Sequence, residues 1–253
     1  VIRATDLWWL LGGIVFAVLS ITFGVLYPVV ISPLFNKYTP LEDEALREKL
    51  LAMAQLAKAD VSEILVEDSS KRDTRDNAYV AGMGKTRRVV LFDTMLDKPH
   101  EHLVSVICHE IGHWKLRHLH RTLPVAALMA FVNFAALKVI FDQHAVLKFA
   151  GVDKTGGLHN PAAIPLFLVL FGVLAKVTGL VTAWLSRSHE RQADIYALEL
   201  TGDWQNLQAA LRNLHTQNLA DLVPGLWNRL TRSHPPAAER LAMCQAFGSG
   251  RPA

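Results

Sequence analysis

The sequence predicts a mainly α-helical, integral-membrane protein that has three transmembrane helices and a polar part with a small β-sheet. Composition is the first observation behind this expectation. Apolar residues make up 51% of the chain and charged residues 19%, whereas about 25% of an ordinary soluble domain is charged. The second observation is that the apolar residues gather in three runs, each at least close to the roughly 20 residues that cross a bilayer.

Charged residues are almost absent from these runs. The first run, 7–35, has none; the second, 122–141, has only Lys138; the third, 161–186, has only Lys176. We interpret each run as a transmembrane helix, and a buried core helix is the alternative for the second, which is the shortest. We expect Lys138 to reach the membrane surface and Lys176, at mid-span, to face protein or water.

The start of the chain gives two further expectations. The first run has no basic flank beyond Arg3 and no small-residue cleavage site, so we do not interpret it as a secretory signal. The chain begins with Val1 rather than Met, and we expect further transmembrane helices upstream.

Two polar stretches flank the second and third runs. We therefore divide the chain into 1–36 (first transmembrane helix and its flank), 37–121 (polar part with the sheet), 122–186 (second and third transmembrane helices and their loop) and 187–253 (second polar part). Two crossings separate the polar parts, so both emerge on one side of the membrane. Lysines and arginines at the membrane ends place that side in the cytosol, at a bacterial inner membrane or, in a eukaryote, the endoplasmic reticulum membrane.

Turn and periodicity signals predict the elements of the polar parts. A capping box at Thr39–Glu42 opens an amphipathic helix that ends near Lys58. Lys98-Pro99 opens a helix that runs to about Leu119. Three short strands are expected between the two helices, at residues 64–66, 78–83 and 88–92, the last two joined by a turn at Gly84-Lys85-Thr86.

The rest of the chain is expected to be helical apart from one loop. The second span begins near Pro124, and a polar loop follows at 142–160. The third span continues as one helix through 187–194, and two or three polar-to-amphipathic helices complete the chain.

The helix that follows Pro99 carries His109-Glu110-Ile111-Gly112-His113, which reads H-E-x-x-H. Residues four apart lie on the same helix face, so His109 and His113 direct two imidazoles at one point. Glu110 lies beside that face and reaches a water bound there. This arrangement is typical of a zinc hydrolase whose glutamate is the general base. The alternative is an exposed polar helix face.

Glu190 and Asp194 follow the third span, one helical turn apart. Because both polar parts emerge on the same side, Glu190 is available to complete a catalytic set of two histidines and one glutamate. Asp194 is placed to accept a hydrogen bond from a ligand imidazole and fix its tautomer. A solvated helix face is the alternative for this pair, and the shared side of the membrane favours the ligand interpretation.

Apart from His234, the other histidines and both cysteines are assigned no chemistry. His189 is adjacent to Glu190 and therefore points away from its face. His118 and His120 have the wrong spacing to share a face with the metal pair, and we interpret them as surface or headgroup-level residues at a helix end. The histidines without partner spacing are His100, His102, His144, His159 and His215. The two cysteines lack C-x-x-C spacing and are interpreted as free thiols, Cys108 and Cys244.

The net charge of +3 is small and dispersed, so no nucleic-acid partner is expected.

Six segments carry a family likeness. They are L-F-N-K-Y-T-P-L-E-D at 34–43, N-A-Y-V-A-G at 77–82, V-V-L-F-D-T-M-L at 89–96, H-E-I-G-H-W-K at 109–115, S-H-E-R-Q-A-D at 188–194 and S-H-P-P-A-A-E-R-L at 233–241. In these segments the sequence resembles the type I CAAX prenyl endopeptidases, integral-membrane zinc metalloproteases that include the a-factor-converting enzyme. The resemblance covers nearly the whole chain and corresponds to the family's C-terminal half.

The resemblance implies a zincin-like (gluzincin) catalytic domain with one Zn²⁺ per chain. The implied zinc ligands are His109, His113 and Glu190, with Glu110 as the base and Asp194 behind the ligands. His189 stands where an aromatic residue is more usual in the family, which we interpret as a change in packing. A water-filled chamber between the membrane helices is also implied, and Lys176 is a candidate to line it.

Substrate contacts are implied by the resemblance more than by the residues themselves. An extended substrate pairs with the edge strand at Asn77, Ala78 and Tyr79. His234 and Arg240 lie near the zinc ion, where a cation or donor stabilises the oxyanion.

The sequence therefore predicts a membrane-embedded, zinc-dependent endopeptidase that acts on a peptide or protein and resembles the CAAX prenyl proteases. Its substrate is prenylated if the host makes such substrates, and the lipid bilayer is its other partner. The main alternative is a general quality-control metalloprotease for membrane proteins with no prenylated substrate. A soluble zinc peptidase and a non-enzymatic membrane scaffold are the others.

Overall fold

The computed structural model describes residues 6–82, 87–152, 161, 163–218, 221 and 223–250. The chain forms two compact units. One comprises Val1–Gly24 and His120–Leu185, and the other comprises Val25–Leu119 and Ser186–Ala253. The first unit holds the apolar helices, and the second holds the sheet and the H-E-x-x-H motif.

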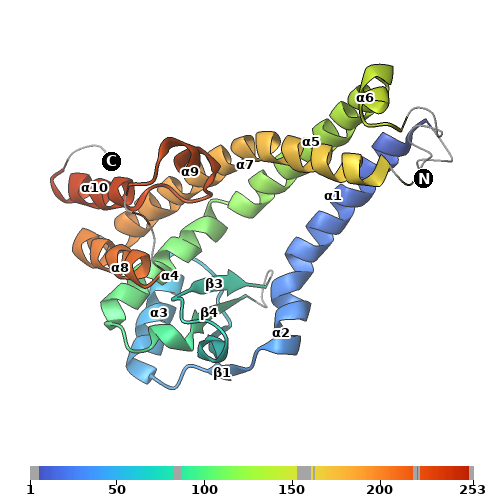
Figure 1. The fold of residues 1–253 in the computed structure, drawn as a ribbon. Coiled ribbons are helices and arrows are strands. Elements are labelled where there is room, and N and C mark those ends of the chain that lie inside the picture. Colours follow the sequence, from blue (N-terminus) through green and yellow to red (C-terminus); the bar gives the residue numbers. More distant parts are fainter. Residues whose placement is uncertain are drawn as a thin grey trace. The chain divides into compact units, whose positions relative to one another are not determined.

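The first unit is built from α1 (Trp8–Leu26), α5 (His118–Phe141), α6 (His144–Phe149) and the first part of α7 (Ala163–Thr201) (Figure 1). Its core is aromatic: Trp8, Phe134 and Phe141 are buried, and Phe167 and Phe171 of α7 pack against them. A Cβ on Gly12 would lie 2.6 Å from the ring of Phe134, so α1 approaches α5 only because this residue is glycine.

Among the described residues two helices, α5 and α7, are long and apolar enough to cross a membrane. Along α7 the side chains of Leu168, Val173 and Val177 are exposed, as expected where lipid covers a helix. The apolar part of α1, Trp8–Gly24, is shorter. Its helix continues into η1 (Tyr27–Ile31) and α2 (Ser32–Phe35), and the first of the three expected crossings stays a prediction.

The two lysines of the apolar helices have different surroundings. Lys138 forms an ion pair with Asp142 near the end of α5, at 2.6 Å, as expected for a lysine near a span end. Lys176 is exposed on α7, and its place in a chamber stays a prediction. The loop expected at 142–160 contains α6, so that expectation is wrong for residues 144–149; His159 lies outside the described residues.

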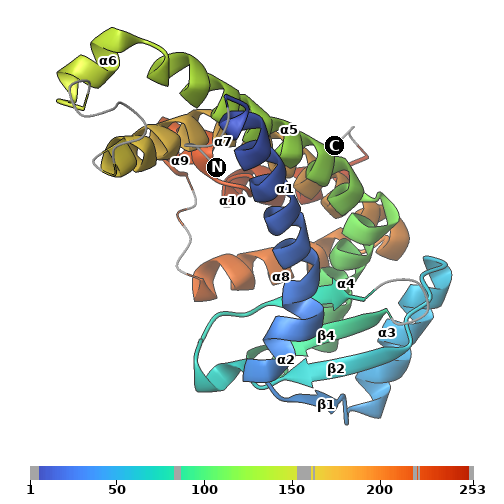
Figure 2. The same cartoon turned by 90° about the vertical axis from the view of Figure 1, so that its right-hand side faces the viewer.

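The second unit is organised around a four-stranded mixed sheet with the order β1-β2-β4-β3 (Figure 2). The strands are β1 (Tyr38–Pro40), β2 (Glu63–Glu67), β3 (Ala78–Ala81) and β4 (Arg88–Phe92). β2 is parallel to β4, and the other two pairs are antiparallel. The strands expected at 64–66 and 88–92 are confirmed, and the one expected at 78–83 ends earlier, at Ala81; residues 83–86, with the expected turn, lie outside the described residues. β3 is an edge strand, paired on one side only among the described strands.

The first predicted helix begins later than expected. The helix α3 (Glu44–Leu56) is capped by Asp43, whose carboxylate accepts a hydrogen bond from the amide of Leu46 at 2.9 Å. The capping box at Thr39–Glu42 is therefore wrong. Its residues are extended because β1 pairs with β2, with Thr39 opposite Val66.

The helix that carries the histidines, α4 (His100–Lys115), also ends earlier than expected. Arg117 has a left-handed backbone with φ of 55°, and α5 starts at the next residue with Pro124 inside it. The expected continuation to Leu119 is wrong because a left-handed residue ends an α-helix. By contrast, α7 passes through 187–194 without a break, as predicted.

Three helices complete the second unit: α8 (Trp204–Gln217), α9 (Leu226–Thr231) and α10 (Ala237–Gly248). The core between α3, α4, α8 and the sheet is aliphatic, with Leu50, Leu91 and Ile107 almost fully buried. Arg187 of α7 donates hydrogen bonds of 2.8 Å to the carbonyls of Leu230 and Arg232, which ties α9 to α7.

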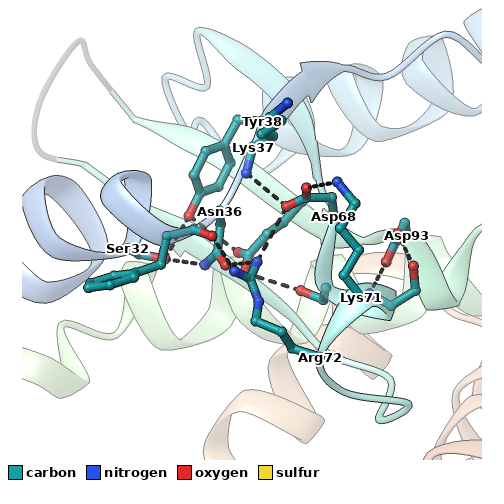
Figure 3. Close-up of polar contacts among 12 residues, drawn as sticks. Ser32, Asn36, Lys37, Tyr38, Asp68, Lys71, Arg72 and Asp93 are labelled. Atoms are coloured by element: carbon teal, nitrogen blue, oxygen red, sulfur yellow. Dashed lines mark hydrogen bonds and ion pairs between the residues drawn. The ribbon is translucent and has the colours of Figure 1, made fainter.

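A polar cluster joins the end of α2 to the sheet. Figure 3 shows the hydroxyl of Tyr38 beside Ser32, at 2.8 Å, and Arg72 reaching Asn36. The same Tyr38 hydroxyl lies 3.1 Å from that of Tyr79. Both phenols donate to Oε2 of the buried Glu67, at 3.3 and 2.8 Å. One carboxylate therefore holds both the entry to β1 and the edge strand β3.

Candidate active site

The helices α4 and α7 bring the two histidines of the motif to Glu190. The Nε2 atoms of His109 and His113 are 3.1 Å apart. Glu190 Oε1 is 3.3 Å from the Nε2 of His113, and Oε2 is 3.6 Å from the Nε2 of His109. One ligand atom from each residue lies within 4.8 Å of the other two. Side chains far apart in the sequence thus direct three donor atoms at one point.

A close approach of the two helices makes this convergence possible. A Cβ on Gly112 would lie 3.2 Å from both Cα and the carbonyl oxygen of Ala193 and 3.1 Å from the ring of Tyr196. Only hydrogen fits in that space without a shift. Gly112 lies between the two histidines in sequence and Ala193 follows Glu190 by three residues, so the contact fixes the separation of the donor groups.

Asp194 and Arg240 form a buried pair behind His109. Asp194 Oδ1 is 2.7 Å from the Nδ1 of His109, and the carboxylate accepts hydrogen bonds from Arg240 Nε and Nη2 at 2.7 and 2.6 Å. Burial alone would raise the pKa of Asp194, yet the charges of Arg240 and His109 lower it to about 2. Asp194 is therefore a carboxylate with no solvent exposure.

Glu190 is also buried and ionised. Burial opposes ionisation, but the imidazoles of His113 and His234 hold the pKa of Glu190 well below its usual range. Its Oε2 lies 2.8 Å from the Nδ1 of His234 and 3.7 Å from Nη1 of Arg240. A buried carboxylate beside the Nε2 atoms of both His109 and His113 fits a divalent metal ion such as zinc.

Glu110 faces a cavity beside these donors. The cavity has a volume of about 850 Å³ and is bounded by α4, α8, the start of β3 and the loop before α10. Apolar side chains of α4 and α8 line part of it, among them Val106, Leu207 and Leu211. Burial raises the pKa of Glu110 above its usual value. The cavity gives a substrate access to the donor atoms and to this carboxylate together.

Of the three residues expected to bind substrate, Asn77 and Ala78 line the cavity. The side chain of Tyr79 points elsewhere, to Glu67. Burial, together with Tyr38 and Glu67, raises the pKa of Tyr79, so its phenol stays a donor. Of the other two predicted residues, His234 also lines the cavity, with 63% of its side chain exposed. Arg240 lines the cavity as well, but its Nε and Nη2 are engaged by Asp194.

The sequence interpretation of His118 as a surface residue is wrong. His118 is 3% exposed, and its Nδ1 lies 2.9 Å from the Nδ1 of His113. His118 follows His113 by five residues, a spacing that would place it off the metal face if α4 continued. The left-handed backbone at Arg117 ends α4 and redirects the chain, so this argument does not apply. His189 is buried and stacks on His118, so its role in packing fits the structure. Both cysteines are free and buried.

Several other histidines have contacts of their own. His100 pairs with Asp43 at 2.9 Å, and His102 lies 3.3 Å from the amide of Asn213. His120 is exposed. His215 lines the cavity, where its Nε2 is buried without a hydrogen bond.

Comparisons with known proteins agree with this geometry. The model of peptidase family M48 matches residues 40–247. A CAAX prenyl protease 1 homolog of Arabidopsis thaliana is 35% identical over 88% of this chain and 53% of its own length. CAAX prenyl protease 1 of Saccharomyces cerevisiae is 33% identical over 94% of this chain and 55% of its own length.

A solved structure extends the match to the fold. The crystal structure of S. mikatae Ste24p superposes with a TM-score of 0.77 at 30% identity, and the match covers 96% of this chain and 59% of that one. The chain spans about half the length of the curated relatives it matches.

Proposed function

Because this chain belongs to peptidase family M48, we propose that it is a membrane-embedded, zinc-dependent endopeptidase of the CAAX prenyl protease type. The observation that carries the proposal is the convergence of His109, His113 and Glu190, beside a cavity that His109, Glu190 and Glu110 line. Two imidazoles and one carboxylate, with room left for water and substrate, are a donor set of catalytic rather than structural zinc sites.

His109, His113 and Glu190 would hold one Zn²⁺ per chain. Zinc in such a donor set supplies a Lewis acid that polarises a peptide carbonyl and acidifies water. Glu110 is the general base: it removes the proton of the attacking water and delivers it to the leaving amine. Burial raises the pKa of Glu110 toward the operating pH, which suits a group that must both accept and release a proton.

Asp194 positions His109 in this proposal. An acceptor at Nδ1 fixes the tautomer that leaves Nε2 free to bind a metal. Arg240 holds Asp194 with two hydrogen bonds and is a positioning residue for the same ligand. His234, exposed on the cavity wall, is the group we assign to the oxyanion of the tetrahedral intermediate.

The edge strand β3 is the proposed docking site of the peptide. Its outer side has no partner strand among the described strands, and Asn77 and Ala78 line the cavity at its start. A substrate in extended conformation adds to such an edge through backbone hydrogen bonds. Tyr79 would contribute its backbone, because its side chain is committed to Glu67.

The substrate class and location follow from the relatives and the apolar helices. We propose that the substrates are peptides or proteins that end in a C-a-a-X sequence with a prenylated cysteine, since the relatives are named CAAX prenyl proteases. The exposed apolar surfaces of α5 and α7 support insertion in the bilayer. We place three crossings in the chain and the active site on the cytosolic side, as the lysines and arginines of the polar parts favour.

The test compares wild type and Glu110→Gln on a farnesylated CAAX peptide and its unprenylated control, with and without a chelator. We expect wild-type cleavage of the farnesylated peptide to stop with chelator and return with zinc. Glu110→Gln should retain zinc and lose about 10²- to 10⁴-fold in rate. Unchanged turnover in Glu110→Gln would remove it as the base. Equal cleavage of both peptides would favour general membrane proteolysis over CAAX specificity.

A further inference from the structure

His113 and His109 are supported from behind by groups of different chemistry. Behind His109 the group is the carboxylate of Asp194, whose Oδ1 lies 2.7 Å from Nδ1. Behind His113 it is another imidazole, that of His118, with the Nδ1 atoms 2.9 Å apart. The two rings are almost perpendicular, with centroids 4.9 Å apart. His118 is the first residue of α5, and it reaches back to α4 because the chain turns at Arg117.

The hydrogen-bond chain has one consistent direction. His113 Nε2 faces the other two donor groups. To offer a lone pair there, the neutral ring must carry its proton on Nδ1. His118 Nδ1 must then be the acceptor of the hydrogen bond from that N–H. The single proton of the neutral His118 ring is therefore on its Nε2. That atom lies 3.4 Å from the Oε1 of Gln192, an acceptor. Gln192 in turn donates its amide to Ser188, at 3.2 Å, so its oxygen is oriented toward His118.

Packing keeps the His118 ring in the plane that this chain requires. The ring stacks on that of His189, with centroids 4.1 Å apart and an interplanar angle of 7°. Both side chains are buried, at 3% and 5% exposure. Gln192 and His189 are on the α7 segment that also carries Glu190. This segment of α7 therefore supplies one donor to the metal centre, Glu190. It also holds His118, the residue behind a second donor, His113.

We propose that His118 is the positioning residue of His113. Its Nδ1 accepts a hydrogen bond from the Nδ1–H of His113. This bond fixes the His113 tautomer whose Nε2 carries a lone pair, and it holds the ring toward the centre, as Asp194 does for His109. The proposal rests on the proposed function, because it takes His113 to be a metal ligand. Removing such a partner typically weakens metal binding 10- to 100-fold.

The test uses two variants of His118, one that removes the hydrogen-bond acceptor and one that removes the aromatic ring. His118→Phe keeps an aromatic ring to stack on His189 and removes the acceptor. His118→Asn removes the ring and keeps an acceptor oxygen near the position of Nδ1. The control is His120→Ala, two residues away and exposed. Zinc dissociation constants are measured on the full chain in detergent by chelator competition, together with the unfolding temperature of the metal-free protein.

We expect His118→Phe to bind zinc 10- to 100-fold more weakly with the metal-free unfolding temperature unchanged. His118→Asn should bind within about threefold of wild type, and His120→Ala should match wild type. Wild-type zinc affinity in His118→Phe would overturn the proposal. If His118→Phe does not fold, His118→Asn decides, because a 10-fold or larger loss there also overturns it. A wild-type chain that binds no zinc would instead refute the proposed function.

Discussion

The contact between Gly112 and Ala193 predicts how tightly the metal centre depends on helix spacing. Gly112→Ala would place a Cβ 3.1–3.2 Å from three atoms, two of which belong to the backbone of Ala193. Backbone cannot rotate away, so α4 and α7 must separate by a few tenths of an ångström. Metal–ligand distances tolerate a change of about 0.2 Å. The required shift therefore matches or exceeds what a bound ion accepts.

The magnitude follows from two opposing effects. Overpacking costs about 1–3 kcal/mol, and alanine in place of glycine stabilises a helix by about 1 kcal/mol. The metal-free protein should therefore lose no more than about 2 kcal/mol of stability. If the strain appears in metal binding, a cost of about 1–3 kcal/mol corresponds to roughly 5- to 150-fold weaker zinc binding.

The assay is zinc affinity by chelator competition, with unfolding temperature measured alongside. Gly179→Ala on α7 is the matched control, because nothing lies within 4 Å of the added Cβ and the gain in helix stability is the same. We expect Gly112→Ala to lose affinity and Gly179→Ala to keep it. A folded Gly112→Ala that binds zinc as tightly as wild type would refute the reasoning from helix spacing.

Two further substitutions test the site, and one labelling experiment tests the core behind it. Glu190→Ala should lower zinc from one ion per chain to almost none by elemental analysis, and full occupancy would remove it from the ligand set. Arg240→Ala removes the positive charge and two hydrogen bonds that compensate the buried Asp194 carboxylate, which costs about 3–5 kcal/mol; an unchanged thermal unfolding temperature would contradict this. Burial raises the pKa of the Cys108 and Cys244 thiols to about 12. Iodoacetamide at pH 8 should therefore modify them only after denaturation, and rapid labelling of the native protein would show that they are accessible.

The sequence predicts local features of the site well and distant ones poorly. The pairing of His109 and His113 follows from helix geometry within five residues. The position of Glu190 beside them depends on the contact between Gly112 and Ala193, which no local pattern contains. Sequence reasoning reaches it only through the count of membrane crossings and through the family resemblance.

Two errors have the same physical origin. Thr39 and its neighbours satisfy the pattern of a helix cap, but pairing with β2 makes them extended. His118 has off-face spacing in a continuous helix, but the left-handed backbone at Arg117 ends that helix. An arginine in this conformation has no sequence signal, because asparagine and glycine are the residues that favour it. In both cases tertiary structure overrides a valid local preference.

The carboxylate of Glu67 has a consequence for how this protein can vary. It accepts from Tyr38, next to the apolar N-terminal segment, and from Tyr79 on the strand beside the cavity. Replacing it would remove the acceptor that both phenols share, so the entry to β1 and the edge strand β3 would be disturbed together. Natural variation at these three positions is therefore expected to be correlated, and a change tolerated at one should require compensation at another.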